Sequence, residues 1–238
     1  MFLIPHKYAY LVGTLIFFIP WLILFWHRKD LRKEMIIMSI IASFAGISTA
    51  YFWTQDWWRP YTITGTRIGI EDLLLGISNG GIAAVLYEEV FRRKLYKRKS
   101  KEEHNKGLLF LVIVNFIFFL VILYGLKTTS FYAFLFSMIS FCVALVILRR
   151  DLLISSLING LLMVLMVLPV YYILIIFSPG LIDKIYLFDT LSGIRITGIP
   201  IEELVFYYLF GFVGTLFYEY WQGWGLVKMP IKWKQNRF

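Results

Sequence analysis

Residues 67–88 read RIGIEDLLLGISNGGIAAVLYE, and residues 198–219 read GIPIEELVFYYLFGFVGTLFYE. The two segments align without a gap at a constant offset of 131 residues. The alignment pairs identical or similar residues, namely Glu71 with Glu202, Asp72 with Glu203, Leu73 with Leu204, and Tyr87-Glu88 with Tyr218-Glu219. Self-similarity at a fixed offset is typical of a duplicated structural unit. We therefore expect an internal repeat.

A shorter similarity lies upstream of each segment. Arg28-Lys29-Asp30-Leu31 resembles Arg149-Arg150-Asp151-Leu152. Each of these basic runs separates two long apolar stretches, and the repeated segment after it supplies a third. The sequence therefore predicts two three-helix units.

The composition indicates a protein that is dissolved in lipid. Of the 238 residues, 59% are hydrophobic and only 16% are charged, which is more apolar surface than one soluble core can bury. A helix that crosses a membrane needs roughly 20 mostly apolar residues. The predicted spans are residues 8–26, 35–53, 68–91, 107–126, 131–148, 152–177 and 199–221.

The fourth span, 107–126, joins the two units. Because three is an odd number, direct fusion would invert the second unit, and an additional span lets both units lie parallel. Asn115 is the only strongly polar residue of this span, so we expect a structural helix that carries no chemistry. The predicted fold class is an all-α polytopic membrane protein of about seven transmembrane helices. Its predicted domains are a first three-helix repeat (1–91), a basic cytoplasmic linker with a linker transmembrane helix (92–130), and a second three-helix repeat with a basic cytoplasmic tail (131–238).

The basic residues predict the orientation. With seven spans, 18 of the 24 Lys and Arg residues fall on one side of the membrane. Such an excess marks the cytoplasmic side, so the N-terminus is expected outside and the C-terminus in the cytoplasm. The net charge of +9 is then explained by topology and by attraction to anionic lipid, and no nucleic-acid partner is expected.

Cysteine and histidine offer little chemistry. Cys142 is the only cysteine and lies inside a predicted span, so an intramolecular disulfide and a cysteine metal cluster are both excluded. His6, His27 and His104 lie near span ends or in loops, where an interfacial histidine is common. No metal site is expected.

Two adjacent carboxylates stand near the start of the third helix of each unit, Glu71-Asp72 and Glu202-Glu203. Acids in this position also complement the positive end of the helix dipole, and Pro200 suits a helix start, so capping alone is one explanation. Charge inside a membrane is costly, however, and intramembrane acids normally face the bundle interior and mark function. Because the pairs recur in both units, we expect them to share one site, where not all can ionise together and one is left as a proton donor.

Aromatic residues surround these acids in the sequence. Trp57, Trp58, Phe206 and Tyr207 are the candidate substrate-binding residues, and Trp53, Tyr208, Phe210 and Phe212 lie nearby. Such residues serve in core packing and in interfacial belts, but their π faces also stabilise a carbocation.

The segments GIPIEELVF, from Gly198 to Phe206, and IGIEDL, from Ile68 to Leu73, give a family resemblance. Together with the doubled three-helix plan, they resemble the membrane-embedded lycopene cyclases, whose mark is a P-x-E-E motif in each half. The second half matches this motif in full, whereas the first half has Gly69 for the proline and Asp72 for the second glutamate.

The resemblance implies a redox-neutral isomerisation of a linear carotenoid. An acid protonates the terminal double bond, the cation closes a six-membered ring, and a base removes a proton. On this basis Glu202 is expected to be the general acid, with Glu203 holding its proton or position, and Glu71 or Asp72 the base. No G-x-G-x-x-G motif follows a strand, so no flavin or nicotinamide cofactor is expected.

A proton-coupled transporter is the principal alternative, since it also uses buried acids and repeats. Transporters usually bind substrate at broken helices, and Asn79-Gly80-Gly81 is the only strong candidate for a break. A non-catalytic paralogue of the cyclases would share every feature named above.

Two other classes lack a required residue. A retinal protein needs a lysine in the membrane interior, and no predicted span has one away from its ends. The segment Glu88-Glu89-Val90-Phe91-Arg92-Arg93 matches a pattern of prenyl-protein proteases, but no histidine follows His104. Glu88 and Glu89 are therefore expected at the cytoplasmic lipid boundary, beside neutralising arginines.

Overall fold

The computed structural model describes residues 3–97 and 104–229. Within these ranges, seven helices are long and apolar enough to cross a membrane, and they confirm the predicted spans to within three residues at each end. They are α1 (His6–His27), α2 (Arg32–Asp56), α3 (Ile70–Val90), α4 (Asn105–Leu120), α5 (Ser130–Leu148), α6 (Leu153–Phe177) and α8 (Ile201–Gln222). A π-helical turn, Val121–Gly125, extends α4, a 3₁₀ turn, Arg150–Leu152, precedes α6, and the short helix α7 (Leu181–Ile185) follows α6.

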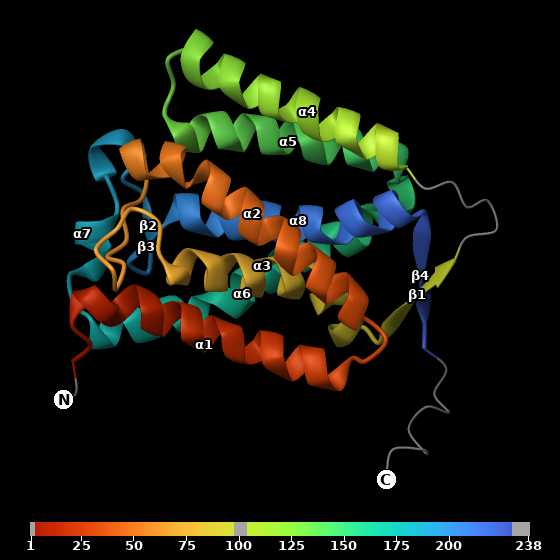
Figure 1. The fold of residues 1–238 in the computed structure, drawn as a ribbon, viewed down its shortest axis with the longest axis horizontal. Helices are drawn as coiled ribbons and strands as arrows, with labels where there is room; N and C mark the ends of the chain where they lie inside the picture. Colours follow the sequence, from red (N-terminus) through yellow and green to blue (C-terminus); the bar gives the residue numbers. More distant parts are fainter. Residues whose placement is uncertain (1–2, 98–103, 230–238) are drawn as a thin grey trace.

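The helices form one bundle (Figure 1), and α1 begins at the opposite end of it from the end at which α8 finishes, as an odd number of spans requires. Helices α3 and α8 occupy the centre and pack on each other. In the apolar 18-residue stretch of each helix, 61% of the residues are buried in α3 and 56% in α8, whereas only 17% are buried in α4. Helix α4 is therefore a peripheral helix that presents most of its apolar surface outward.

The packing fits two repeat-like halves. Helices α1 and α2 pack on α3, while α5 and α6 pack on α8, and the halves also meet through α1 with α6 and α2 with α5. Two glycines 131 residues apart permit the closest contacts: a Cβ on Gly80 would lie 2.3 Å from the Met38 carbonyl oxygen, and one on Gly211 would lie 2.7 Å from that of Asn159. Equivalent helices thus approach each other at equivalent points.

A two-stranded antiparallel ribbon closes one end of the bundle. Strand β1 (Arg93–Lys97) directly follows α3, and strand β4 (Trp224–Lys228) follows α8. Leu95 lies opposite Leu226, which is its own counterpart at the 131-residue offset. An antiparallel pair centred on equivalent residues is what a two-fold relation between the halves produces. All of β1 lies in the predicted basic linker (92–130), where no strand was expected.

Two buried arginines connect the helices to the ribbon. Arg28 donates to both carboxylate oxygens of Asp30, at 3.0 and 2.9 Å, and to the backbone carbonyl of Arg93 at 2.6 Å. Arg149 donates to both oxygens of Asp151, at 2.9 Å each, and to the backbone carbonyl of Trp224 at 2.7 Å. The short upstream similarity in the sequence therefore marks a structural feature that both halves share.

We call the end of the bundle that carries β1 and β4 the ribbon end. The opposite end, at which α3 and α8 begin, is called the acid end. At the acid end, a short antiparallel pair, β2 (Arg195–Ile196) with β3 (Ile199–Pro200), leads into α8. A short 3₁₀ turn, Phe188–Thr190, lies in the same connection. Part of the predicted basic linker and most of the predicted basic tail, including Arg98, Lys99, Lys101, Lys232, Lys234 and Arg237, lie outside the described residues.

Candidate active site

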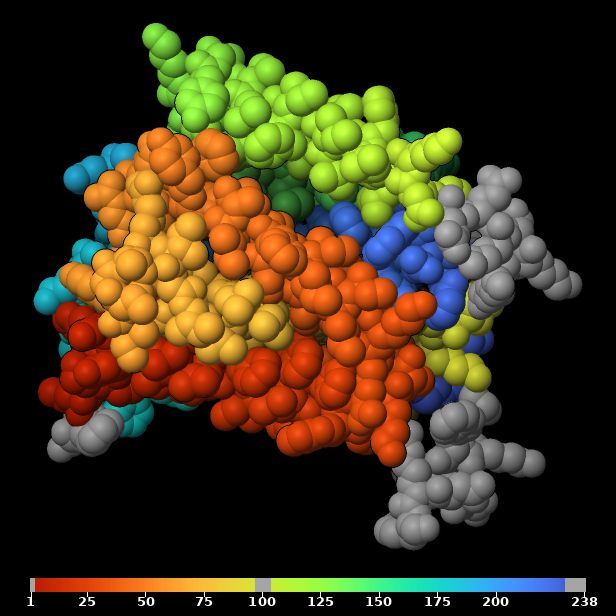
Figure 2. Space-filling model, in the orientation of Figure 1, coloured from red at the N-terminus to blue at the C-terminus, as the bar shows by residue number. Residues whose placement is uncertain are grey.

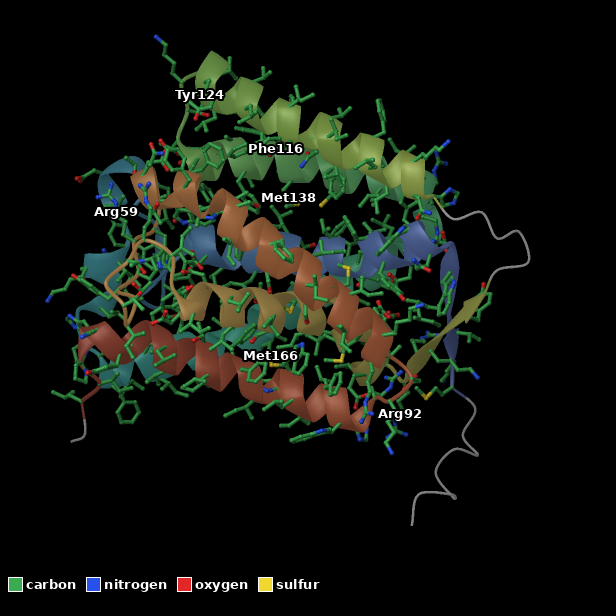
Figure 3. All side chains as sticks on the ribbon, viewed as in Figure 1. Arg59, Arg92, Phe116, Tyr124, Met138 and Met166 are labelled. Carbon is green, nitrogen blue, oxygen red and sulfur yellow. The ribbon has the colours of Figure 1, made fainter. Side chains whose placement is uncertain are left out.

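A cavity of about 450 Å³ lies between the two halves. It is lined mostly by apolar side chains from α1, α2, α3, α5, α6 and α8, and α4 adds Val112, Asn115, Phe116 and Phe119. The surface is hollowed between α2 and α4 (Figure 2), and Figure 3 labels two lining residues of this region, Phe116 and Met138. Helix α4, expected to be purely structural, is therefore also part of the cavity wall.

Asp72 lines this cavity from the first turn of α3. Its Oδ1 accepts a hydrogen bond from the Tyr10 hydroxyl of α1 at 2.8 Å, and its Oδ2 accepts the backbone N–H of Gly69 at 2.7 Å. The Gly69 contact caps the start of α3, so the capping explanation holds in part for this residue. The Tyr10 contact also ties the carboxylate to a neighbouring helix.

Glu203 lines the cavity from the first turn of α8. The Tyr171 hydroxyl of α6 donates to its Oε2 at 2.8 Å, and the Tyr186 hydroxyl lies 2.7 Å from that of Tyr171. Tyr186 follows α7, outside the spanning helices. Burial, and secondly the nearby Glu203, raises the pKa of Tyr186 well above its usual value, so this phenol keeps its proton.

Glu71 and Glu202, the first members of the two acidic pairs, point toward the loops that precede their helices. Glu71 accepts the backbone N–H of Ile63 at 2.6 Å, and Glu202 accepts that of Ser192 at 2.7 Å. In each the second carboxyl oxygen, Oε2, is buried without a hydrogen-bond partner among the described residues. Neither Glu71 nor Glu202 is among the described residues that line the cavity.

The two acidic pairs were expected to share one site, and this is wrong for Glu71 and Glu202, which do not line the cavity, whereas Asp72 and Glu203 do. Consecutive residues of a helix point about 100° apart, so only one member of an adjacent pair can face a given neighbour. The loop before each helix decides which one, because it supplies the amide that holds Glu71 or Glu202 away from the cavity.

The four predicted substrate-binding aromatics, Trp57, Trp58, Phe206 and Tyr207, all line the cavity. Trp57 is 3% exposed, and its ring centroid lies 5.7 Å from that of Phe206. Trp58 packs edge-to-face on Tyr10, with centroids 5.1 Å apart. Aromatic rings therefore surround the space next to both cavity-facing carboxyls.

Several lining residues were not predicted as site residues. Tyr10 and Tyr171 hold the two carboxyls, and Asn79 and Asn115 bring amides to a mostly apolar wall. Tyr10 and Tyr171 lie on other helices than the acids they hold, and no sequence pattern joined them to those acids. The sequence offered one signal for these two tyrosines: both lie near the ends of predicted spans, at the same membrane level as the acids.

Glu88 does not lie at a lipid boundary, so that expectation is also wrong. Glu88 and its counterpart Glu219 are 0% exposed and Glu34 is 1% exposed, and the six carboxyl oxygens have no described hydrogen-bond partner outside this trio. Glu89 alone makes the expected contact with an arginine, at 3.1 Å from Arg28. Among the described residues, no group of three or more His, Cys, Asp or Glu is arranged to hold a metal ion.

The competing classes can be compared with this geometry. Helix α3 runs without interruption through Asn79-Gly80-Gly81, so the candidate break of a transporter is absent from this described segment. Of the described residues that line the cavity, none is a lysine, which a retinal Schiff base would need.

One of the comparisons with known proteins gives a match. A family model described as lycopene cyclase matches residues 7–90 and 127–221. No curated protein and no solved structure matches the chain. The two matched segments contain the three helices of each half, and the unmatched residues between them contain β1 and α4.

Proposed function

This chain belongs to the lycopene cyclase family, and on that premise we propose that it closes a six-membered ring at the end of a linear carotenoid. The observation that carries the proposal is the convergence of Asp72 and Glu203, from equivalent positions in two halves, on one apolar cavity. The reaction is an isomerisation of the intramolecular lyase type, in which no electron is gained or lost, so an acid, a base and a dry cavity suffice for it.

Glu203 is the general acid in this proposal, in place of Glu202. The Tyr171 hydroxyl donates to its Oε2, the Tyr186 hydroxyl also interacts with the carboxyl, and the side chain lines the cavity, where it can deliver a proton. The phenol chain from Tyr186 through Tyr171 fixes the carboxyl and stabilises the carboxylate that remains after proton transfer.

Asp72 is the base in this proposal. Both of its oxygens accept hydrogen bonds, one from Tyr10 and one from Gly69, so the carboxyl is held in a fixed orientation at the cavity. A carboxylate opposite the acid provides the counter-charge for the cation and then accepts the proton that the ring loses. The departure from glutamate to aspartate in the first half keeps this function, because the carboxylate is still present.

Glu71 and Glu202 act as positioning residues in this proposal. Each ties the loop before its helix to the helix start, through Ile63 and Ser192 respectively. They thereby fix the direction in which the next residue, Asp72 or Glu203, points.

The substrate class follows from the cavity. Its lining is mostly apolar, and the aromatic faces of Trp57, Trp58 and Phe206 suit a carbocation. We propose that a linear carotenoid moves into it sideways from the bilayer, at the hollow between α2 and α4. The basic residues support an orientation with the N-terminus outside and the C-terminus in the cytoplasm, so the acid end would face outward.

The test is expression of the chain in a bacterial host that accumulates lycopene, followed by separation of the pigments. We expect cyclic carotenoids to form at the expense of lycopene. A folded, membrane-inserted protein that leaves every linear carotenoid unchanged would overturn the proposal and favour a non-catalytic paralogue or a transporter.

A further inference from the structure

Asn79 is a buried amide without an assigned function. It lies at the middle of α3, is 4% exposed and lines the cavity. Its carbonyl oxygen, Oδ1, has no hydrogen-bond partner among the described residues. A buried carbonyl without a partner costs free energy, so its presence in a tightly packed helix calls for a ligand or a transient charge that uses it.

The neighbouring glycines do not explain Asn79. Gly80 allows α2 to pack closely, since a Cβ there would lie 2.3 Å from the Met38 carbonyl oxygen. The Asn79 side chain interacts instead with the hydroxyl of Tyr207, which lies one turn beyond Glu203 on α8. The contact leaves Oδ1 unused. The counterpart of Asn79 in the second half is Phe210, so the cavity has this amide on one side only.

Asn79 lies on the same side of the cavity as the proposed base. It is seven residues, or two helical turns, from Asp72, so the two side chains lie on one face of α3, about 10 Å apart along its axis. Glu203, the proposed acid, stands on the other central helix, α8. During closure, the carbon that receives the proton and the carbon that finally carries the cation lie opposite each other in the new ring. A ring protonated from the α8 side therefore turns its cationic carbon, and the neighbouring C–H bond that the base breaks, toward α3.

We propose that Asn79 is a further catalytic residue, whose side-chain carbonyl stabilises the ring cation on the α3 side of the cavity. This inference rests on the proposed function. In the step concerned, the O–H bond of the acid breaks and a C–H bond forms at the terminal alkene. A second double bond then supplies two electrons for the new C–C bond, which moves the positive charge to the carbon facing Asn79. Loss of a proton to the carboxylate base forms a C=C bond and restores neutrality.

A carbonyl dipole held in a low-dielectric cavity is suited to this task. It is already oriented before the charge develops, so no reorganisation is needed when the cation forms. The lifetime of the cation also governs which neighbouring C–H bond is broken. Asn79 should therefore affect the ratio of ring isomers as well as the rate.

The test compares Asn79→Leu, Asn79→Asp and Ser78→Ala in membranes that contain lycopene. Leucine keeps the size of the side chain but removes its dipole, whereas aspartate keeps an oxygen at the same place. Ser78 is the matched control, because it is buried on the same helix, bonds its own helix at the Leu74 carbonyl at 2.7 Å, and does not line the cavity in the described structure.

We expect Asn79→Leu to lower the maximal rate by about tenfold to a hundredfold. The substrate concentration at half-maximal rate and the melting temperature should stay near those of Ser78→Ala, and the ratio of ring isomers should change. Asn79→Asp should recover much of the rate. An Asn79→Leu protein with the rate and isomer ratio of Ser78→Ala would overturn the proposal.

A folded Asn79→Asp protein without activity would also overturn it, and this variant decides the matter if Asn79→Leu does not fold. Failure of the proposed function is distinguishable, because the wild-type chain itself would then leave lycopene linear.

Discussion

The central helices α3 and α8 carry buried acids at both ends, and the two ends differ in what surrounds them. At the acid end, Asp72 and Glu203 line a cavity and accept hydrogen bonds from tyrosines of other helices. At the ribbon end, Glu88 and Glu219 are fully buried and neither lines the described cavity. The acids at both ends recur at the 131-residue offset, so repetition and burial do not distinguish the two ends. The acid end differs because its carboxyls face a cavity and accept hydrogen bonds from oriented donors, and this marks it as the candidate active site.

The largest expected effect concerns the base at the acid end. Asp72→Asn keeps an oxygen that can accept from Tyr10, but it cannot take a proton from carbon. We expect the rate of cyclisation to fall by about 10² to 10⁴, while the folded protein remains in the membrane. Pigment formation per amount of inserted protein is the measurement, and a rate within a few fold of wild type would remove Asp72 from the chemistry.

A smaller effect is expected at Tyr171, which holds the proposed acid. Tyr171→Phe removes one of the two tyrosine hydroxyls that interact with Glu203 but leaves the carboxyl in place. Because a hydrogen bond to a charged group contributes about 1.5 to 3 kcal/mol, we expect roughly a tenfold to hundredfold loss of rate and a changed pH dependence of the rate. Thermal unfolding in detergent provides the control: a loss of activity explained by a loss of folded protein would assign Tyr171 to packing alone.

The smallest effect is expected at the ribbon end. Glu88→Gln removes a buried carboxyl that has no described partner outside Glu34 and Glu219. Since replacing buried ionisable groups by neutral ones of similar volume is often neutral or stabilising, the melting temperature should stay level or rise and activity should persist. A strong loss of cyclisation in Glu88→Gln would show that the ribbon end also takes part in the reaction, and the contrast between the two ends would fail.

The sequence predicted the seven spans well, because apolar runs of membrane length are a strong signal. It also predicted the repeat and the aromatic lining of the cavity. It did not predict the ribbon, whose strands of five residues lie beside basic residues and carry no clear alternation. Helix α4 was expected to be structural only, and a nearly all-apolar helix gave no sign that Asn115 and Phe116 line the cavity.

The choice within each acidic pair could not be made from the sequence. Two adjacent acids at a helix start are chemically alike, and the residue that faces the cavity is set by where the preceding loop places its amide. The partners Tyr10 and Tyr171 are 62 and 32 residues away from the acids that they hold. Such contacts depend on how helices are arranged in space, which local sequence patterns do not encode.

The most direct test of the central claim is a comparison of Glu203→Gln with Glu202→Gln in the same lycopene-containing membranes, with rates normalised to inserted protein. Both variants keep the size of the side chain, and in Glu202→Gln the new side-chain amide oxygen can still accept the backbone N–H of Ser192. We expect Glu203→Gln to lose cyclisation by about 10² to 10⁴, and Glu202→Gln to retain a substantial part of it. The reverse order, with Glu203→Gln active and Glu202→Gln inactive, would contradict the assignment of the cavity-facing carboxyl as the acid.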